Sequence, residues 1–504
     1  MSALDITIIF TYFVAILGAG FWFGRKEKDT RDFFIGNRQI HWGAVLLSIV
    51  ATEISAATFL AVPATGFREN LNYFQFGLGS LVARFFIAAL FIGAYYRYDC
   101  VTVYEYLSKR FGDKTRYTAT IFFFVTRLLG SGVRLLIAAL GLAVVMGWPL
   151  SFTIVLFAVI AVVYTSFGGI KAIIWTDVIQ AFVFIAGGAA VIWFLLNQVP
   201  GGFEQIWKIA DNAGKLEVFK WAPEAVAGQS AWKSWLTQPN IFWIAFINAF
   251  VTTLAALGTD QDMTQRMITC KTASLSKRSL ILSGFIGIPV MAIFLFVGIG
   301  IFAYYQTHSG LALPYLDGTS TIDYEKIFPH FIRTALPSGV KGLLVIGIFA
   351  AAMSSLDSAL GALSSSSVVD IYRPLIHRDA SEKHYLWISR INIVIFGVVL
   401  AGIAWMLSGQ RQLLWLCFKV VSITYGALLG VFLLGATSTR GSNSSNLIAM
   451  ISGAVVNTAL LILIETNRIP LAWTWLILIG TLWTYGLSYG LDIVGLGNKA
   501  RGKK

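Results

Sequence analysis

Charged side chains are scarce in this chain of 504 residues, at 12% of the total, whereas an ordinary soluble domain contains about 25%. Hydrophobic residues make up 57%. A soluble fold of this length would need more polar surface to cover its core. The shortage of charge excludes a soluble enzyme, a disordered chain and a secreted disulfide scaffold. It leaves a polytopic α-helical membrane protein.

Cysteine and histidine are also scarce. The three cysteines do not form a disulfide framework and lack the spacing of metal ligands. All five histidines lie in loops or at span ends, which disfavours a haem or a histidine relay within the bilayer. The chain has neither a phosphate-binding loop motif nor an H-E-x-x-H zinc motif. We therefore expect no enzyme activity, because no reactive pair or metal cluster has suitable spacing.

Long apolar runs recur along the whole chain, and about 20 such residues cross a bilayer as a helix. Barrel strands alternate apolar and polar residues over about 10 positions, so the runs at 280–302 and 447–464 exclude a barrel. The pattern predicts one all-α membrane domain, 1–504, with about thirteen transmembrane helices. The expected spans are 5–24, 42–66, 73–96, 117–146, 150–166, 172–198, 238–257, 279–305, 338–365, 386–408, 412–436, 445–465 and 470–490.

Lys and Arg gather in one set of connections between these spans. Because cytoplasmic loops are enriched in basic residues, the N-terminus is predicted outside and the C-terminus inside a cell membrane. The net charge of +13 then reports topology, and we expect the lipid bilayer but no nucleic acid as a partner. We also expect a functional monomer. The basic connections are 25–38, 97–116, Lys171, 266–278, 373–390, Arg440 and 499–504.

The second span carries an unusual polar run around Glu53, with Thr52, Ser55 and Thr58 beside it and Pro63 further on. Ionisable residues within spans are costly and commonly mark a substrate or ion path. The run predicts a broken helix that offers hydroxyls, the carboxylate and unwound carbonyls to a ligand. The alternative is a hydroxyl-lined packing surface between helices.

The seventh span contains a similar interruption, T-T-L-A-A-L-G-T-D at 252–260. Two broken helices in corresponding positions are typical of transporters with inverted repeats. The sequence therefore predicts two repeats, with one helix before them and two helices after them. The first repeat is expected over 42–198 and the second over 238–436, with the extra helices at 5–24 and 445–490.

The ninth span places Ser354, Asp357 and Ser358 on one helical face. Oxygen ligands suit hard cations, so this face predicts a cation site, which Asp177 of the sixth span could complete. The alternative is close helix packing with serines bonded to their own helix.

Arg127 and Arg134 lie seven residues apart on nearly the same face of the fourth span. One of them could balance Glu53 or contact a carboxylate of the substrate. The alternative is a structural ion pair within the bundle. Arg84 and Lys419 are interpreted as snorkelling or paired groups.

At these positions the chain resembles the sodium/solute symporter family, which includes transporters of sugars, sialic acid and monocarboxylates. The matching stretches are G-G-I-K-A-I-I-W-T-D-V-I-Q at 168–180, G-T-D-Q-D-M-T-Q-R at 258–266, 350–358 and 103–111. The resemblance implies a LeuT-type fold, a 5+5 inverted repeat with one preceding helix and two following ones.

The resemblance also implies a Na⁺ site between the second and ninth spans. Its ligands would be backbone oxygens of Ala51, Ile54 and Ala351 and the hydroxyls of Ser354 and Ser355. The implied substrate residues come from three spans. They are Glu53, Ser55 and Thr58, then Gly77 and Ser80, and finally Thr253 and Ala256.

Several positions depart from better-known members. Sugar-transporting relatives carry an amide at the position of Glu53. Relatives with a second Na⁺ site carry serine at the position of Asp357, while Asp177 matches the aspartate of that site. With Ser358, these residues form a possible second Na⁺ site. The sialic-acid branch has a substrate-binding arginine at the position of Gly130, one turn before Arg134, so Arg134 is expected to bind substrate.

The expected function is Na⁺-coupled uptake of a small polar solute by alternating access. The solute would be a polyol, a sugar-derived compound or an organic acid. One alternative is proton coupling, because Glu53, Asp177 and Asp357 titrate if desolvated. Another is a sensor that binds solute without sustained transport. A channel is the third, although paired broken helices favour alternating access.

Overall fold

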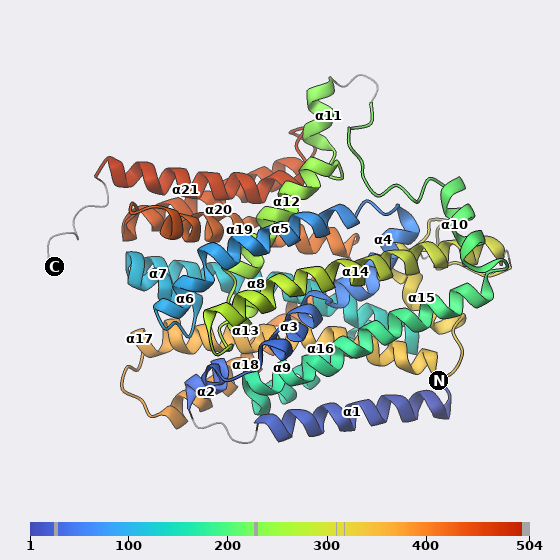
Figure 1. Ribbon diagram of the computed structural model, residues 1–504, viewed down its shortest axis with the longest axis horizontal. Coiled ribbons are helices and arrows are strands. Elements are labelled where there is room, and N and C mark those ends of the chain that lie inside the picture. Colours follow the sequence, from blue (N-terminus) through green and yellow to red (C-terminus); the bar gives the residue numbers. More distant parts are fainter. Residues whose placement is uncertain (25–28, 226–229, 309, 317, 496–504) are drawn as a thin grey trace.

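The computed structural model describes residues 1–24, 29–225, 230–308, 310–316 and 318–495, and within them every regular element is a helix. Most of the long helices run along the long axis, and the two termini lie at opposite ends of it (Figure 1). Because the bilayer core holds no water, a helix that pairs its own backbone groups is the stable form of each apolar run.

The helices have the following bounds. The long ones are α1 (Ala3–Gly24), α5 (Phe74–Leu90), α8 (Asp113–Met146), α9 (Leu150–Gln198), α12 (Phe242–Gly258), α14 (Ala273–Thr307), α16 (Val340–Ser366), α18 (Glu382–Met406), α19 (Leu413–Thr437), α20 (Asn443–Glu465) and α21 (Leu476–Ile493). The shorter ones are α2 (Thr30–Ile35), η1 (Gly36–Arg38), α3 (Trp42–Glu53), η2 (Ala57–Ala61), α4 (Val62–Arg68), α6 (Ile92–Arg97), α7 (Val103–Phe111), α10 (Gly202–Asn212), α11 (Ala231–Thr237), α13 (Gln261–Met267), η3 (Tyr324–Lys326), α15 (Ile327–Thr334), η4 (Ser367–Tyr372), α17 (Arg373–Leu375) and η5 (Trp473–Trp475).

The described residues contain eleven helices long and apolar enough to cross a membrane. A bent pair, Trp42–Glu53 with Ala57–Arg68, adds a twelfth when its two arms count as one span. Leu150–Ser166 is a further, shorter apolar helix. An all-helical protein with many apolar spans is thus confirmed. The total of thirteen spans and the orientation of the termini stay predictions.

The second predicted span is broken where its polar run predicts. Helix α3 ends at Glu53, and Ile54 leaves the helix with φ −78° and ψ 63°. The chain is helical again from Ala57, and the two arms are bent by 53°. The last carbonyls of a helix lack partners within it, so this break exposes backbone oxygens in the middle of a span.

The seventh predicted span is interrupted later than the sequence suggests. Helix α12 stays regular to Gly258, so the predicted interruption at 252–260 is wrong for most of its length. Thr, Ala and Leu are compatible with a helix and contain no breaking signal. The chain departs at Thr259 and Asp260, where the Asp260 carboxylate caps α13 with a 3.0 Å bond from a backbone N–H.

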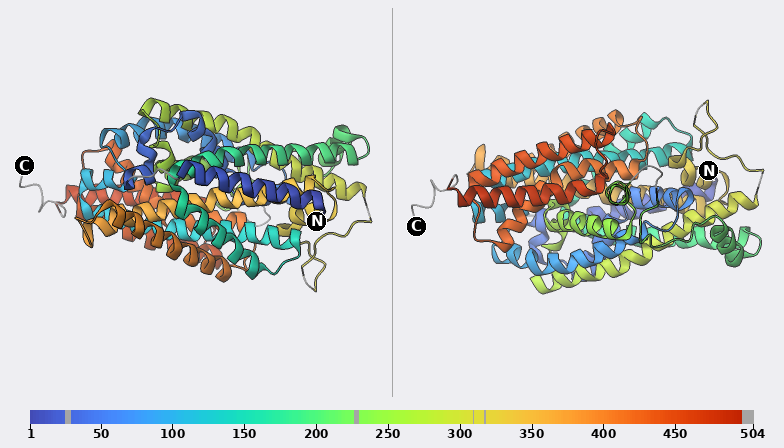
Figure 2. Two further views of the ribbon diagram at one scale, coloured as in Figure 1. Left: turned by 90° about the horizontal axis from the view of Figure 1, so that it is seen from below. Right: turned by 90° about the horizontal axis from the view of Figure 1, so that it is seen from above.

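Helix α16 lies at the centre of the bundle and is almost completely buried. It packs along α9, α8 and α1, while α3 and α14 pack against α9 beside it. Helix α1 lies on one side of the bundle, and α20 and α21 lie on the opposite side against α19 (Figures 1 and 2). Gly169 separates the two arms of α9, which are the predicted spans 150–166 and 172–198, at φ 45°.

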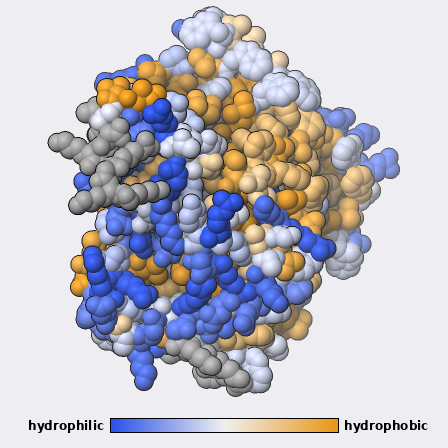
Figure 3. All heavy atoms as spheres, turned by 60° about the vertical axis from the view of Figure 1, so that its left-hand side comes forward, coloured by the Kyte–Doolittle hydropathy of each residue, from blue (hydrophilic) through white to orange (hydrophobic). Residues whose placement is uncertain are grey.

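Hydrophilic side chains gather at the end of the molecule that carries α2, α7 and α17 (Figure 3). Arg31, Arg116, Arg373 and Arg378 line a depression there. They belong to the connections predicted to face the cytoplasm. Of those connections, positions 25–28 and 499–504 lie outside the described residues.

The segment between α10 and α11 contacts the C-terminal end of α4, the second arm of the broken span. The Lys215 ammonium donates to the backbone carbonyls of Phe67 at 2.6 Å and Glu69 at 2.9 Å. These carbonyls terminate α4, where a cation is favourable. Burial lowers the pKa of Lys215. The C-terminal end of α4 is therefore held by a residue far along the chain.

Helices α4 and α14 approach each other at two glycines. A Cβ at Gly298 would lie 2.2 Å from the carbonyl oxygen of Pro63, and one at Gly66 would lie 2.5 Å from that of Leu295. Small residues allow such close backbone contact between membrane helices. Helix α4, the second arm of the broken span, is thus packed directly on α14.

We expect Gly298→Ala to lower the melting temperature of the purified protein by about 5 °C, because the methyl group forces the two backbones apart. Gly287→Ala is the matched control in the same helix, since no atom lies within 4 Å of a Cβ there. That variant should keep or slightly raise the melting temperature, as alanine is the better helix former. Equal shifts in the two variants would contradict the contact.

Candidate functional site

A cavity of about 250 Å³ lies beside the break between α3 and η2. Its walls come from α3, η2, α5, α8, α12, α14 and α19. All eight predicted substrate residues line it, although they come from four separate spans. They are Glu53, Ser55, Thr58, Gly77, Ser80, Arg134, Thr253 and Ala256. The structure therefore brings the predicted set together, and its role in binding stays a prediction.

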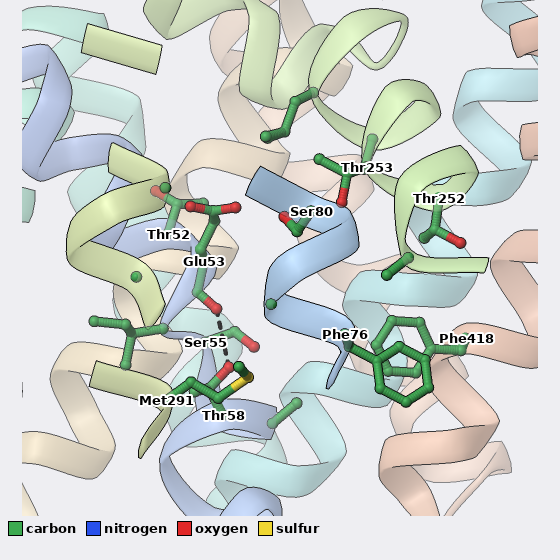
Figure 4. Close-up of a pocket in the computed structure, with 18 of the residues that line it drawn as sticks. Thr52, Glu53, Ser55, Thr58, Phe76, Ser80, Thr252, Thr253, Met291 and Phe418 are labelled. Atoms are coloured by element: carbon green, nitrogen blue, oxygen red, sulfur yellow. Dashed lines mark hydrogen bonds between the residues drawn. The ribbon is translucent and has the colours of Figure 1, made fainter. Parts of the chain in front are cut away.

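Polar and aromatic side chains line different parts of the cavity (Figure 4). Glu53 and Thr58 lie on one side, where the Thr58 hydroxyl donates to the backbone carbonyl of Glu53 at 3.0 Å. Phe76 and Phe418 lie on the other side. Small-molecule sites commonly combine an apolar wall with a few placed polar groups.

Glu53 forms an ion pair with Arg84, not with Arg127 or Arg134. Arg84 also donates to the Ser283 hydroxyl at 2.6 Å. From the sequence, Arg84 is interpreted only as a snorkelling or paired group, and its place in the cavity wall is not predicted. An arginine within a span is the signal that could have indicated a functional position.

Arg127 forms a structural ion pair, as one of the two interpretations predicts. Its guanidinium lies 2.5 Å from the Asp260 carboxylate and 2.8 Å from that of Asp262. The hydroxyl of Tyr425 donates to Asp260 at 2.7 Å. All four side chains are buried. Arg127 is therefore held at the break between α12 and α13.

Arg266 extends this buried chain of charges. It is 0% exposed, although it belongs to a connection that the sequence predicts to face the cytoplasm. Its guanidinium lies 3.0 Å from both Asp262 and Asp177. The hydroxyl of Ser48 donates to Asp177 at 2.5 Å. The two carboxylates stabilise Arg266 in the interior, because a buried charge requires a partner. Its bonds connect α13 with α9 and α3.

The predicted Na⁺ ligands lie where α3 meets α16. The hydroxyls of Thr52 and Ser354 are 3.3 Å apart, which brings the end of α3 against α16. The buried hydroxyl of Ser355 has no hydrogen-bond partner among the described residues. Ile54 leaves the helix at the same place. This junction therefore offers hydroxyl and backbone oxygens, the ligand type of a hard cation.

The possible second cation site has two free carboxylate oxygens. Asp177 Oδ2 accepts from Ser48 and Arg266, while Asp177 Oδ1 has no hydrogen-bond partner among the described residues. Asp357 Oδ1 accepts from the backbone N–H of Ser358 at 2.6 Å, and its Oδ2 is likewise without a partner there. The two carboxyl groups are close enough to interact electrostatically.

Curated relatives match most of the chain. The sodium/sialic acid symporter SiaT of Proteus mirabilis (strain HI4320) is 28% identical over 457 residues, 89% of this chain and 87% of the relative. The sodium-coupled monocarboxylate transporter 2 of Mus musculus is 28% identical over 86% of this chain and 68% of the relative. These homologues are transporters, which favours a protein that is not an enzyme.

A solved structure of a Na⁺-coupled sialic acid symporter, substrate-bound and outward-open, superposes with a TM-score of 0.84 over 98% of each chain at 23% identity. A transporter of the nucleobase-cation-symport-1 family gives 0.53 at 16% identity, over 91% of this chain and 93% of that one. Both show likeness of fold. The family model named Sodium:solute symporter family matches residues 33–453. The chain therefore belongs to the sodium:solute symporter family.

Proposed function

We propose that this protein couples inward Na⁺ movement to uptake of a small polar organic solute across the cell membrane. The observation that carries this function is the break after Glu53, which adjoins both the central cavity and the oxygen-rich junction with α16. Membership of the family supports Na⁺ as the coupling ion. The solute is a polyol, a sugar-derived compound or an organic acid.

Na⁺ binds the backbone oxygens of Ala51, Ile54 and Ala351 and the hydroxyls of Ser354 and Ser355. Such a ligand set joins α3 to α16 and fixes the broken segment that forms one wall of the cavity. Solute and Na⁺ then stabilise the same arrangement, and each raises the affinity for the other by the same factor.

The cycle is alternating access. The two repeats, 42–198 and 238–436, move relative to each other around the central site, with helix 5–24 and the pair at 445–490 outside them. The N-terminus lies outside, the C-terminus inside, and the monomer is the working unit. Each net charge that enters gains about 2.3 kcal/mol per 100 mV of membrane potential.

The strongest competing candidate is proton coupling through Asp177 and Asp357. Around α13 four carboxyl groups, those of Asp177, Asp260, Asp262 and Asp357, meet only two bonded guanidinium groups, so full ionisation leaves uncompensated negative charge. A second Na⁺ held by Asp177, Asp357 and Ser358 removes that imbalance, as does a proton. We propose the second Na⁺, because both free oxygens are ligands of the right kind.

Removal of the Ser354 and Ser355 hydroxyls should raise the Na⁺ concentration for half-maximal effect about tenfold or more, since two of the proposed ligands are lost. The Na⁺-dependent rise in melting temperature of the purified protein measures this, with choline as the replacement ion. Ser366→Ala is the matched control, because Ser366 is also a buried α16 serine without a hydrogen-bond partner. An unchanged Na⁺ response in the double alanine variant would refute the assigned site.

Asp357→Asn should reduce the Hill coefficient for Na⁺ from above one to about one, because the second ion loses its carboxylate. Its pH dependence should match that of the unmodified protein. Asp492→Asn is the control, as Asp492 is a buried aspartate of α21 with a partnerless Oδ2. If the Hill coefficient is unchanged and the pH dependence disappears, the coupled ion at Asp357 is a proton.

A further inference from the structure

The ionised side chains of the central cavity carry an uneven charge. Among the residues that line it, Glu53 is the acidic one, while Arg84 and Arg134 are basic. The cavity therefore has a net charge of one positive unit. Behind this wall Arg127 pairs with Asp260 and Asp262, Asp262 also pairs with Arg266, and none of these side chains lines the cavity.

Arg84 already bonds to several protein groups and is therefore not available to bind a solute. Its guanidinium donates to the Ser283 hydroxyl at 2.6 Å and to the Leu280 carbonyl at 3.4 Å, both on α14. Gly284 makes room for it, since a Cβ there would lie 2.6 Å from its side chain. The Arg84 side chain is only 4% exposed. Arg84 is thus a positioning residue that fixes the Glu53 carboxylate.

Glu53 keeps one carboxylate oxygen for a ligand. Arg84 engages Oε1, whereas Oε2 is buried and has no hydrogen-bond partner among the described residues. A quarter of the side chain is nevertheless open to the cavity. A buried carboxylate oxygen without a partner costs free energy, so a donor group in this cavity stabilises it.

Arg134 is the other group without a partner. Within the described ranges it forms no hydrogen bond or ion pair, and its Nε is buried. A guanidinium is always charged and fits a carboxylate in two parallel bonds. It therefore calls for an acceptor group that carries negative charge.

We infer that the solute is a monoanion, a carboxylate that also bears hydroxyl or amide donors. Arg134 binds the carboxylate, and Glu53 Oε2 accepts from a donor on the same molecule. This inference rests on the proposed function and specifies the substrate class of its site. Na⁺ at the neutral oxygens beside the cavity reinforces the attraction for an anion.

Other charge types fit less well. A cation would meet two guanidinium groups and a carboxylate already paired on one oxygen. A neutral polyol would satisfy Glu53 but leave the Arg134 guanidinium without a bonded anion, and a dianion would meet only one free guanidinium. An unsubstituted carboxylate would leave Glu53 Oε2 without a donor. Of the solutes that satisfy both partnerless groups, the hydroxylated or amidated monoanion is the one whose charge also offsets the net positive charge of the cavity.

The test compares solutes that differ only in charge. The first four solutes share a six-carbon polyol skeleton. Gluconate carries one negative charge, sorbitol none, glucamine one positive charge and glucarate two negative charges. Lactate and glycerol extend the comparison to a smaller skeleton, and N-acetylneuraminate extends it to a larger one. We expect monoanions to raise the melting temperature in Na⁺ more than their neutral or cationic counterparts. The inference is overturned if no monoanion of any size stabilises the protein, whether or not a neutral or cationic solute does.

Two variants should change the preferred charge rather than merely weaken binding. Arg134→Gln makes the cavity neutral and should cost the monoanion about tenfold or more in affinity while sorbitol is unaffected. Glu53→Gln gives two positive charges and should shift the ratio of glucarate to gluconate affinity toward glucarate. Lys419→Gln removes a basic group of α19 that does not line the cavity, and it should leave both ratios unchanged. Uniform loss for all solutes in both variants would show a structural role and refute the inference.

Measurements with and without Na⁺ separate the two proposals. Na⁺-dependent binding of a neutral solute would retain the proposed symport and reject the monoanion. Monoanion binding that does not depend on Na⁺ would retain the monoanion and reject the proposed Na⁺-coupled symport. Radiolabelled uptake into proteoliposomes with an inward Na⁺ gradient then identifies the transported member of the set.

Discussion

The need to neutralise charge away from water shapes the interior of this protein. An ion in a low-dielectric interior costs several kcal/mol unless another ion faces it. Arg127 and Arg266 meet this requirement through Asp260, Asp262 and Asp177. The pairs run from α8 through α13 to α9, and Ser48 adds α3. These connections join elements that are distant in sequence, and they fix the place where α12 ends.

Because most buried charges are paired, the polar atoms without partners are informative. Four of these atoms fall in two neighbouring places, while others, such as Ser366 Oγ and Asp492 Oδ2, lie elsewhere among the described residues. Glu53 Oε2 and Arg134 Nε belong to side chains of the central cavity, whereas Ser355 Oγ and Asp357 Oδ2 belong to α16 near the end of α3. A stable fold rarely leaves such atoms unsatisfied, so clusters of them are candidates for ligand binding. We propose that polar groups of a solute satisfy the first pair and a cation satisfies the second.

The sequence predicts what is local and periodic. Apolar runs predicted most of the spans, and the polar run around Glu53 predicted a broken helix, which the structure shows at Ile54. Partners across the bundle carried no such signal. Glu53 and Arg84 lie on different helices, and no spacing rule links them. Arg266 stands at the edge of a basic connection, so its charge suggested solvent, while its two aspartate partners bury it. Partner choice depends on packing, which a single sequence does not display.

In the proposed mechanism, the position of the break couples the two ligands. Glu53 is the last residue of α3 and faces the cavity, while Thr52, one residue earlier, contacts Ser354 of α16. Neighbouring residues of a helix end point in different directions, so one short segment serves both places. A shift of this segment toward α16 on cation binding also moves Glu53, and with it the free oxygen that a solute needs. Since Arg84 anchors that carboxylate to α14, the movement is constrained from both sides. Coupling between cation and solute therefore requires no long pathway, because both sites share the same broken turn.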